Sequence, residues 1–164
     1  STANYVVVET IPLPSNVSAG FIKITPDGSQ AWLGEFPLYR GVSSIIVVIS
    51  TGTFDTNTIT LPKRQSPGAI LFSPDSTTAY VPVNGPQIAV MNVATRKAVA
   101  LIDSISSVNG LAISPDGNRE YVTDFGSGAL AAVDTASKKV VYSVPVGSEP
   151  ECRGFTGQLD RLCG

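Results

Sequence analysis

The segment Ile113–Asp124, ISPDGNREYVTD, has two counterparts earlier in the chain: ITPDGSQAWLGE at Ile24–Glu35 and FSPDSTTAYVPV at Phe72–Val83. Each contains a short apolar run, a Pro-Asp turn and a second run rich in β-branched and aromatic residues, which together predict a β-hairpin. Proline presets φ for the turn, aspartate can bond the backbone two residues on, and glycine accepts a positive φ. The chain therefore repeats one hairpin three times.

The three Pro-Asp pairs stand 48 and 41 residues apart, a period typical of β-propeller blades. In each repeat a third apolar run and, after a polar turn, a fourth run follow the hairpin, which predicts a four-stranded antiparallel sheet. Such a sheet cannot bury both of its apolar faces alone, and stacking against neighbouring sheets would bury them. We expect an all-β fold: a β-propeller repeat array forming one domain over 1–164, with about three full blades at roughly 19–62, 68–102 and 109–146.

Partial blades are expected at both ends of the array. Residues 1–10 resemble the fourth strand of an incomplete blade, and the repeat stops in an irregular tail over 147–164. Since three blades cannot close a ring, three arrangements stay open: a fragment of a longer propeller, completion by a second copy or another chain, or a four-bladed ring shared by the two ends. We favour association between chains, as a dimer with about seven or eight blades.

The third repeat carries the most specific motifs: PDG at Pro115–Gly117, YVTD at Tyr121–Asp124 and VDT at Val133–Thr135. It resembles the YVTN family of β-propeller repeat proteins, whose signature includes Pro-Asp-Gly, Tyr-Val-Thr-Asn and Val-Ile-Asp-Thr. The resemblance covers most of residues 19–150 and is looser in the first two repeats. It implies a propeller fold and says little about activity, because the family ranges over surface, binding and enzymatic roles.

Composition narrows the class of function. The 164 residues carry a formal net charge of −2 and no basic footprint for nucleic acid. The longest apolar run, Ile45–Ile49, is far shorter than the ~20 residues of a membrane-spanning helix. The chain has no histidine, which excludes a Ser-His-Asp triad and a His-ligated metal, and two cysteines fall short of a zinc site. We expect no cofactor, no nucleic-acid partner and no membrane span.

Two sequence features favour a secreted or cell-surface location. Cys152 and Cys163 lie close together in the last stretch and predict a disulfide in an oxidising compartment, with two reduced thiols as the alternative. Asn16 begins the one permitted Asn-x-Ser/Thr triplet and is a candidate glycosylation site. Both features fit an extracytoplasmic protein.

Loops at one end of a propeller converge over a rigid scaffold, and ligands usually bind there. The longest such loop, after the second strand of the first repeat, carries aromatic and arginine residues that favour recognition, with packing at the rim as the alternative. The candidate ligand-binding residues are Glu35, Phe36, Tyr39, Arg40, Lys63, Arg64, Asp124, Phe125 and Glu149. By contrast, the turn residues Asp27, Asp75 and Asp116 are expected to bond their own backbone.

The leading hypothesis is a non-catalytic binding or structural propeller that recognises a protein or a glycan through its loops, or associates with itself to complete a ring. The alternative is a propeller enzyme, a lactonase-like hydrolase or a dehydrogenase-associated subunit, with carboxylates or a metal at the central channel. A third interpretation makes the chain one piece of a larger processed protein.

Overall fold

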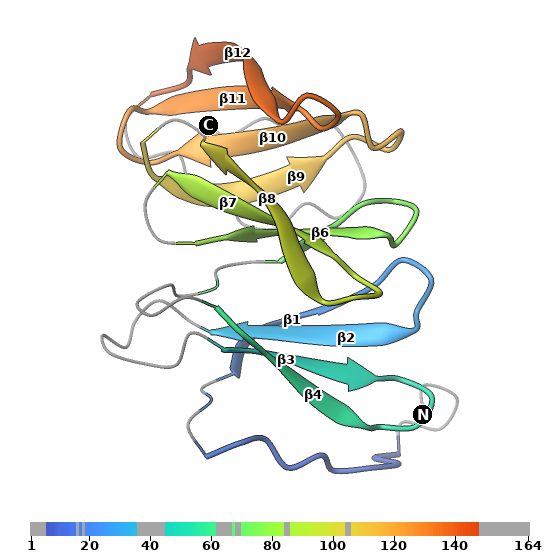
Figure 1. The fold of residues 1–164 in the computed structure, drawn as a ribbon. Helices are drawn as coiled ribbons and strands as arrows, with labels where there is room; N and C mark the ends of the chain where they lie inside the picture. The colour runs from blue at the N-terminus through green and yellow to red at the C-terminus, as the bar shows by residue number, and fades with distance from the viewer. Residues whose placement is uncertain are drawn as a thin grey trace.

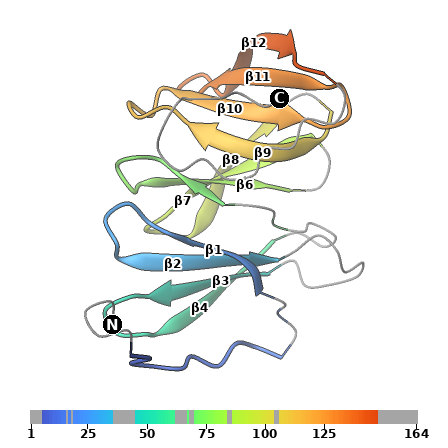
Figure 2. The ribbon, with the colours of Figure 1, turned by 180° about the vertical axis from the view of Figure 1, so that it is seen from behind.

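The computed structural model describes residues 6–15, 17, 19–35, 45–61, 67, 70–83, 86–103 and 106–147. The regular structure in these ranges consists of three four-stranded antiparallel sheets. Figures 1 and 2 show the sheets stacked face to face along the molecule. Within the same ranges, no helix is long and apolar enough to cross a membrane. The all-β array of three blades expected from the repeat is confirmed.

The three sheets, called blades 1, 2 and 3, follow one another in the sequence. Blade 1 contains β1 (Ala19–Ile24), β2 (Gln30–Glu35), β3 (Ile45–Ser50) and β4 (Thr56–Thr60). Blade 2 contains β5 (Leu71–Phe72), β6 (Thr78–Pro82), β7 (Gln87–Asn92) and β8 (Lys97–Asp103). Blade 3 contains β9 (Val108–Ile113), β10 (Arg119–Asp124), β11 (Ala129–Asp134) and β12 (Lys139–Pro145). Strands pair in chain order in every blade, so that each blade is an antiparallel meander.

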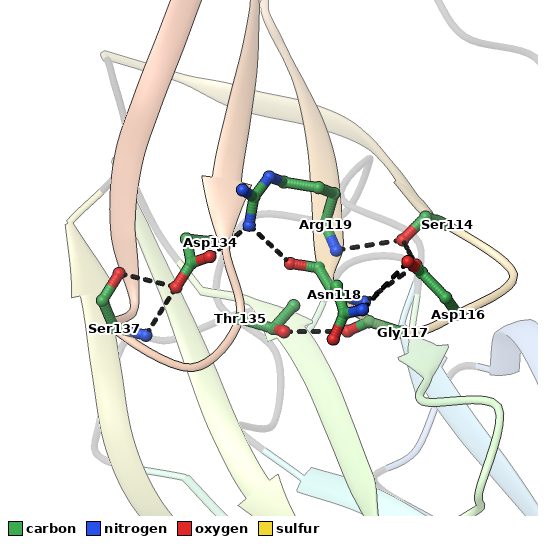
Figure 3. Close-up of polar contacts among 8 residues, drawn as sticks. All are labelled: Ser114, Asp116, Gly117, Asn118, Arg119, Asp134, Thr135 and Ser137. Carbon is green, nitrogen blue, oxygen red and sulfur yellow. Dashed lines mark hydrogen bonds and ion pairs between the residues drawn. The ribbon is translucent and has the colours of Figure 1, made fainter.

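Each Pro-Asp turn is held by its own aspartate, as expected from the sequence. In blade 3 the Ser114 hydroxyl donates to the Asp116 carboxylate at 2.5 Å, and the Asn118 N–H donates to it at 3.1 Å (Figure 3). The same two bonds recur in blade 1 with Thr25, Asp27 and Ser29, and in blade 2 with Ser73, Asp75 and Thr77. Led by the hydroxyl bond, these contacts hold the pKa of each aspartate below its usual value.

The turn between the third and fourth strands of each blade lies beside the Pro-Asp turn of the same blade. In blade 3 the Asp134 carboxylate accepts the Ser137 N–H at 2.8 Å and forms an ion pair with Arg119, and the Thr135 hydroxyl donates to the Gly117 carbonyl at 2.8 Å (Figure 3). The two turns at this end of the blade are thereby tied together. We call it the turn end, and the opposite end, which carries the β10–β11 connection and its counterparts in the other blades, the loop end.

Apolar clusters fill the spaces between blades. One joins blades 1 and 2 and includes Trp32, Phe72 and Met91. A second joins blades 2 and 3 and includes Tyr80 and Val122. A third covers part of the outer face of blade 1 with side chains from the segment that precedes β1, namely Ile11, Leu13 and Val17. Burial of apolar surface between stacked sheets, at about 25 cal/mol per Å², is the main stabilising contribution.

One aromatic position in the second strand of each blade faces the following blade. Trp32 of blade 1 is fully buried and meets Phe72 of blade 2 edge to face, with ring centroids 5.5 Å apart. Tyr80 of blade 2 is buried in the cluster with Val122 of blade 3. Tyr121 of blade 3 holds the same position and is 40% exposed. This aromatic side chain therefore lies in both joints between blades, and in blade 3 the side chain at the same position is exposed.

We expect the substitution Trp32→Ala to lower the free energy of unfolding by about 3–5 kcal/mol, because it empties the centre of the joint between blades 1 and 2. Urea denaturation followed by circular dichroism measures the loss. Val99→Ala, on an exposed apolar side chain of β8, is the matched control and should change stability by less than about 0.5 kcal/mol. Equal losses in the two variants would contradict the importance of this joint.

Candidate functional site

The loop end of blade 3 brings two connections together. β10 ends at Asp124, and a four-residue turn, 125–128, leads into β11; Ser106 and Ser107 lie in the connection from β8 to β9. The turn is closed by the Gly128 N–H, which donates to the Asp124 carbonyl at 3.0 Å, and Gly128 has a φ of +66°, a conformation that glycine adopts without strain. The sequence FGSG therefore forms a tight turn beside a serine-containing connection.

The Asp124 side chain links these two connections. It is fully buried. From the β8–β9 connection it accepts the Ser106 N–H at 2.9 Å, the Ser106 hydroxyl at 2.7 Å and the Ser107 N–H at 2.8 Å. From its own turn it accepts the Gly126 N–H at 3.0 Å and the Ser127 hydroxyl at 2.6 Å. We call this set of contacts the Asp124 clamp.

The clamp has clear electrostatic and steric consequences. Burial alone would raise the pKa of Asp124, but the bonds from Ser127, Ser106 and the backbone amides outweigh it and hold the pKa well below its usual value. The carboxyl group is therefore ionised at neutral pH. A Cβ atom on Gly126 would lie 2.6 Å from the Ser106 hydroxyl oxygen, so that a side chain at this position would displace the hydroxyl that donates to Asp124.

Phe125 lies at the start of the clamped turn. Its N–H donates to the Ser107 carbonyl at 3.1 Å, which fixes the backbone of this residue to the β8–β9 connection. Its side chain is 42% exposed. An aromatic side chain is thus presented at the loop end on a backbone that is held from both sides.

A second buried carboxyl group lies in the joint between blades 2 and 3. Glu120, in β10, is fully buried, and neither of its carboxyl oxygens has a hydrogen-bond partner among the described residues. Burial raises the pKa of Glu120 to about 8. Burial, and then the charge of Glu120, raise the pKa of Tyr80 to about 12. Glu120 is therefore largely neutral at pH 7.

Sequence reasoning missed Glu120. The signal was present in the repeat, because the residues at the same position in blades 1 and 2 are Ala31 and Ala79. All three side chains are buried. A carboxyl group at a buried strand position that is otherwise alanine marks the residue as unusual for its place.

Two of the nine predicted binding residues are described with their side chains, Asp124 and Phe125, and the structure places them next to each other. Of the pair, Phe125 reaches solvent, while the Asp124 carboxylate faces protein donors. Glu35 is the last residue of β2. The other predicted residues lie outside the described ranges, and their roles stay predictions: Phe36, Tyr39, Arg40, Lys63, Arg64, Glu149, Asn16, Cys152 and Cys163.

The carboxyl groups of the described residues are not arranged as a metal site. No group of three or more His, Cys, Asp or Glu side chains there is placed to hold a metal ion. The two buried carboxyl groups occupy different environments, one surrounded by donors and one by apolar side chains. They do not form a paired carboxylate site.

Comparisons with known proteins identify the fold. No protein-family model matches the sequence, and no curated protein matches it. Among solved structures, Kuenenia stuttgartiensis hydrazine synthase matches with a TM-score of 0.68 at 20% identity, over 88% of this chain and 41% of that chain. Apo AztD from Citrobacter koseri matches with a TM-score of 0.70 at 15% identity, over 88% and 40%. U3-55K matches with a TM-score of 0.62 at 16% identity, over 76% and 38%.

These similarities support a β-propeller fold and nothing finer. The chain spans about two fifths of the length of the three solved structures, whose matched shares are 41%, 38% and 40%. At such identities the likeness concerns architecture, because one propeller scaffold serves many unrelated functions. The function must be argued from the site itself.

We expect Asp124→Asn to lower the free energy of unfolding by about 2 kcal/mol or more, because an amide nitrogen would face N–H and O–H donors. Urea denaturation at about pH 7 measures the loss of free energy of unfolding. Asp103→Asn is the control, since Asp103 is an exposed carboxylate at the same end that accepts the Gln87 amide at 3.0 Å. Because the pKa of Asp124 is lowered in the fold, its stabilisation should fade below about pH 4. A similar, small loss in both variants would contradict the clamp.

Glu120→Gln should remove a pH dependence from the stability of the protein. The pKa of Glu120 is raised in the fold from 4.5 to about 8, so that the unfolded chain releases this proton first and stability falls as pH rises between those values. The wild type should lose on the order of a few kcal/mol over this window, and the variant should lose less. The midpoints of urea denaturation, measured at intervals of about one pH unit from about pH 4.5 to about 8.5, give the difference. Glu9→Gln, at an exposed glutamate, is the control and should keep the wild-type dependence of stability on pH. The same pH dependence in the wild type and in Glu120→Gln would contradict the raised pKa of Glu120.

Proposed function

We propose that this chain is a non-catalytic binding propeller related to the YVTN repeat proteins, which works outside the cytoplasm and recognises a protein or a glycan through its loop end. The observation that carries the proposal is the clamped, exposed aromatic at Phe125. Its exposed fraction of 42% and its fixed backbone provide a contact surface that loses little conformational entropy on binding.

The proposal of a binding role is supported by the arrangement of the clamp. The Asp124 carboxylate accepts hydrogen bonds from five donor groups in two connections. These bonds hold the loop end of blade 3 in one conformation. Loops held by a rigid scaffold are the usual place for recognition in such folds. Aromatic side chains on rigid backbone are enriched among the residues that dominate binding energy.

Kinship with the YVTN family is supported by how its motif lies in blade 3. The four residues Tyr121–Asp124 are the last four of the six residues of β10. Tyr121 points away from blade 2, Val122 lies in the joint with blade 2, and the Thr123 hydroxyl accepts the Gly110 N–H at 2.9 Å. Asp124, where the family signature has Asn, carries the clamp. Each motif position thus has a separate task in the blade.

The extracellular location rests on the candidate disulfide and glycosylation site in the sequence. The missing histidine removes the commonest acid/base catalyst and supports a non-catalytic role. The enzyme alternative needs carboxylates that converge on a channel. Among the described carboxyl groups, the two that are buried, Asp124 and Glu120, instead lie at the junction of blades 2 and 3.

We expect Phe125→Ala to weaken binding by about tenfold or more, because it removes an aromatic anchor. The probes are a printed glycan array and an array of extracellular protein domains, each incubated with the labelled chain. Phe54→Ala is the matched control, since Phe54 is 40% exposed and lies in the β3–β4 turn, at the turn end of blade 1.

Signal that falls with Phe125→Ala and persists with Phe54→Ala supports the loop end as the binding surface. Equal signals from wild type and Phe125→Ala, or equal losses from the two variants, would overturn it. Circular dichroism of both variants confirms that the blades remain folded.

A further inference from the structure

The outer face of blade 3 carries exposed apolar side chains beside the Arg119–Asp134 ion pair. Tyr121 of β10 pairs with Ala132 of β11, which in turn pairs with Tyr142 of β12, so that the three side chains lie side by side on one face. Tyr121 is 40% exposed and Tyr142 is 64% exposed. This row of side chains, called the Tyr121 face, has the composition of an interface rather than of a solvated sheet.

The opposite end of the stack presents a second apolar surface. On the outer face of blade 1, Ile22 pairs with Leu33 and Ile24 pairs with Ala31. The side chains preceding β1 cover the β2 and β3 part of this face, but Ile22 and Ile24 remain 63% and 56% exposed. We call the exposed part the Ile24 face. The extended segment before β1 passes on the same side of blade 1 (Figures 1 and 2).

The joints inside the chain show what fits on each of these faces. In the joint between blades 1 and 2, Trp32 packs on Phe72, the residue that ends β5. In the joint between blades 2 and 3, Tyr80 lies in one cluster with Ile113, the residue that ends β9. The residue at the same place in β1 is Ile24. The repeat therefore supplies the aromatic half of a third joint in blade 3, and in blade 1 it leaves open the β1 part of the aliphatic half, beside the β2 and β3 part that the segment before β1 covers.

We propose that two copies of this chain associate head to tail, with the Tyr121 face of each copy packed on the Ile24 face of the other. The contact repeats the pairing of the second-strand aromatic with the residue that ends the next first strand, as in the two joints within the chain. A joint of this kind uses two different surfaces, and two copies that satisfy both of them form a closed ring with two-fold symmetry. Two copies with three blades each supply six blades, within the four to eight that propellers use.

The ring has a structural consequence that does not depend on the proposed function. Head-to-tail packing keeps all blades pointing the same way around the axis, as in any propeller. Both copies therefore present their loop ends on one rim, and both Pro-Asp turn ends lie on the other. The assembly therefore presents two copies of each loop-end surface on the same rim.

The experiment measures the mass of the full chain in solution by light scattering over a range of concentrations. The wild type should form a dimer of twice 17.1 kDa. Tyr121→Lys and Ile24→Glu each place a charge in both joints of the ring, and each variant alone should be monomeric. Both positions are exposed in the single chain, so that neither substitution should prevent folding.

Mixing the two variants gives the decisive result. In the mixed pair, one joint combines an unaltered Tyr121 with an unaltered Ile24, and the other brings the introduced lysine against the introduced glutamate. The dimer should therefore reappear on mixing. Val99→Glu, on an exposed apolar side chain of β8 outside both faces, is the control and should leave the dimer intact.

Three results would overturn the proposal. They are a monomeric wild type, which would point to further blades of a longer chain as the occupant of these faces; a dimer that survives Tyr121→Lys or Ile24→Glu; and a mixture that stays monomeric although each variant shows the circular dichroism of the wild type.

Discussion

A four-stranded sheet with two apolar faces needs a neighbour on each side, and the rest of this structure depends on that requirement. Along β10, for example, Glu120, Val122 and Asp124 point toward blade 2, whereas Tyr121 points away from it. The alternation of side chains in a strand thus assigns one set of residues to the preceding blade and the other to the following blade. Because blades 1 and 2 repeat this assignment, the two joints within the chain are alike, whereas on the outer face of blade 1 the segment before β1 covers Ala31, Leu33, Val47 and Ile49, positions that face the preceding blade in blade 2.

The Pro-Asp turns show how the same requirement acts at the turn end. Ser76 has a φ of +62°, a conformation in which its counterparts in the other blades are glycines, Gly28 and Gly117. The backbone strain is offset because the Ser76 hydroxyl accepts the Asp27 N–H from blade 1 at 2.9 Å. In the next joint a Cβ on Gly117 would lie 3.3 Å from Pro74. Adjacent turns therefore interlock, by a hydrogen bond in one joint and by close packing in the other.

The sequence was sufficient to predict the blades, because the hairpins, the four-strand pattern and the aspartate-held turns all depend on residues a few positions apart. The site was less predictable. Asp124 could be assigned to a loop end from its position after a strand, but its burial depends on Ser106 and Ser107, which directly precede β9, stand 18 and 17 positions away in the sequence, and reach Asp124 through the pairing of β9 with β10. Glu120 likewise lies close enough to Tyr80 of blade 2 for its charge to raise the pKa of that tyrosine. Local pattern cannot anticipate contacts between residues that lie this far apart in the sequence.

The joints also differ in a way that explains how a carboxyl group can occupy one of them. In the first joint the large Trp32 lies in the cluster with Ala79, and in the second the smaller Tyr80 lies near Glu120. A larger side chain on one blade is matched by a smaller one on the next, so that both joints are filled. Glu120 adds volume where tyrosine replaces tryptophan, and the raised pKa of about 8 means that the group it buries is mostly a neutral acid at pH 7. The energetic penalty of burying a charge is thereby reduced to that of burying a polar group.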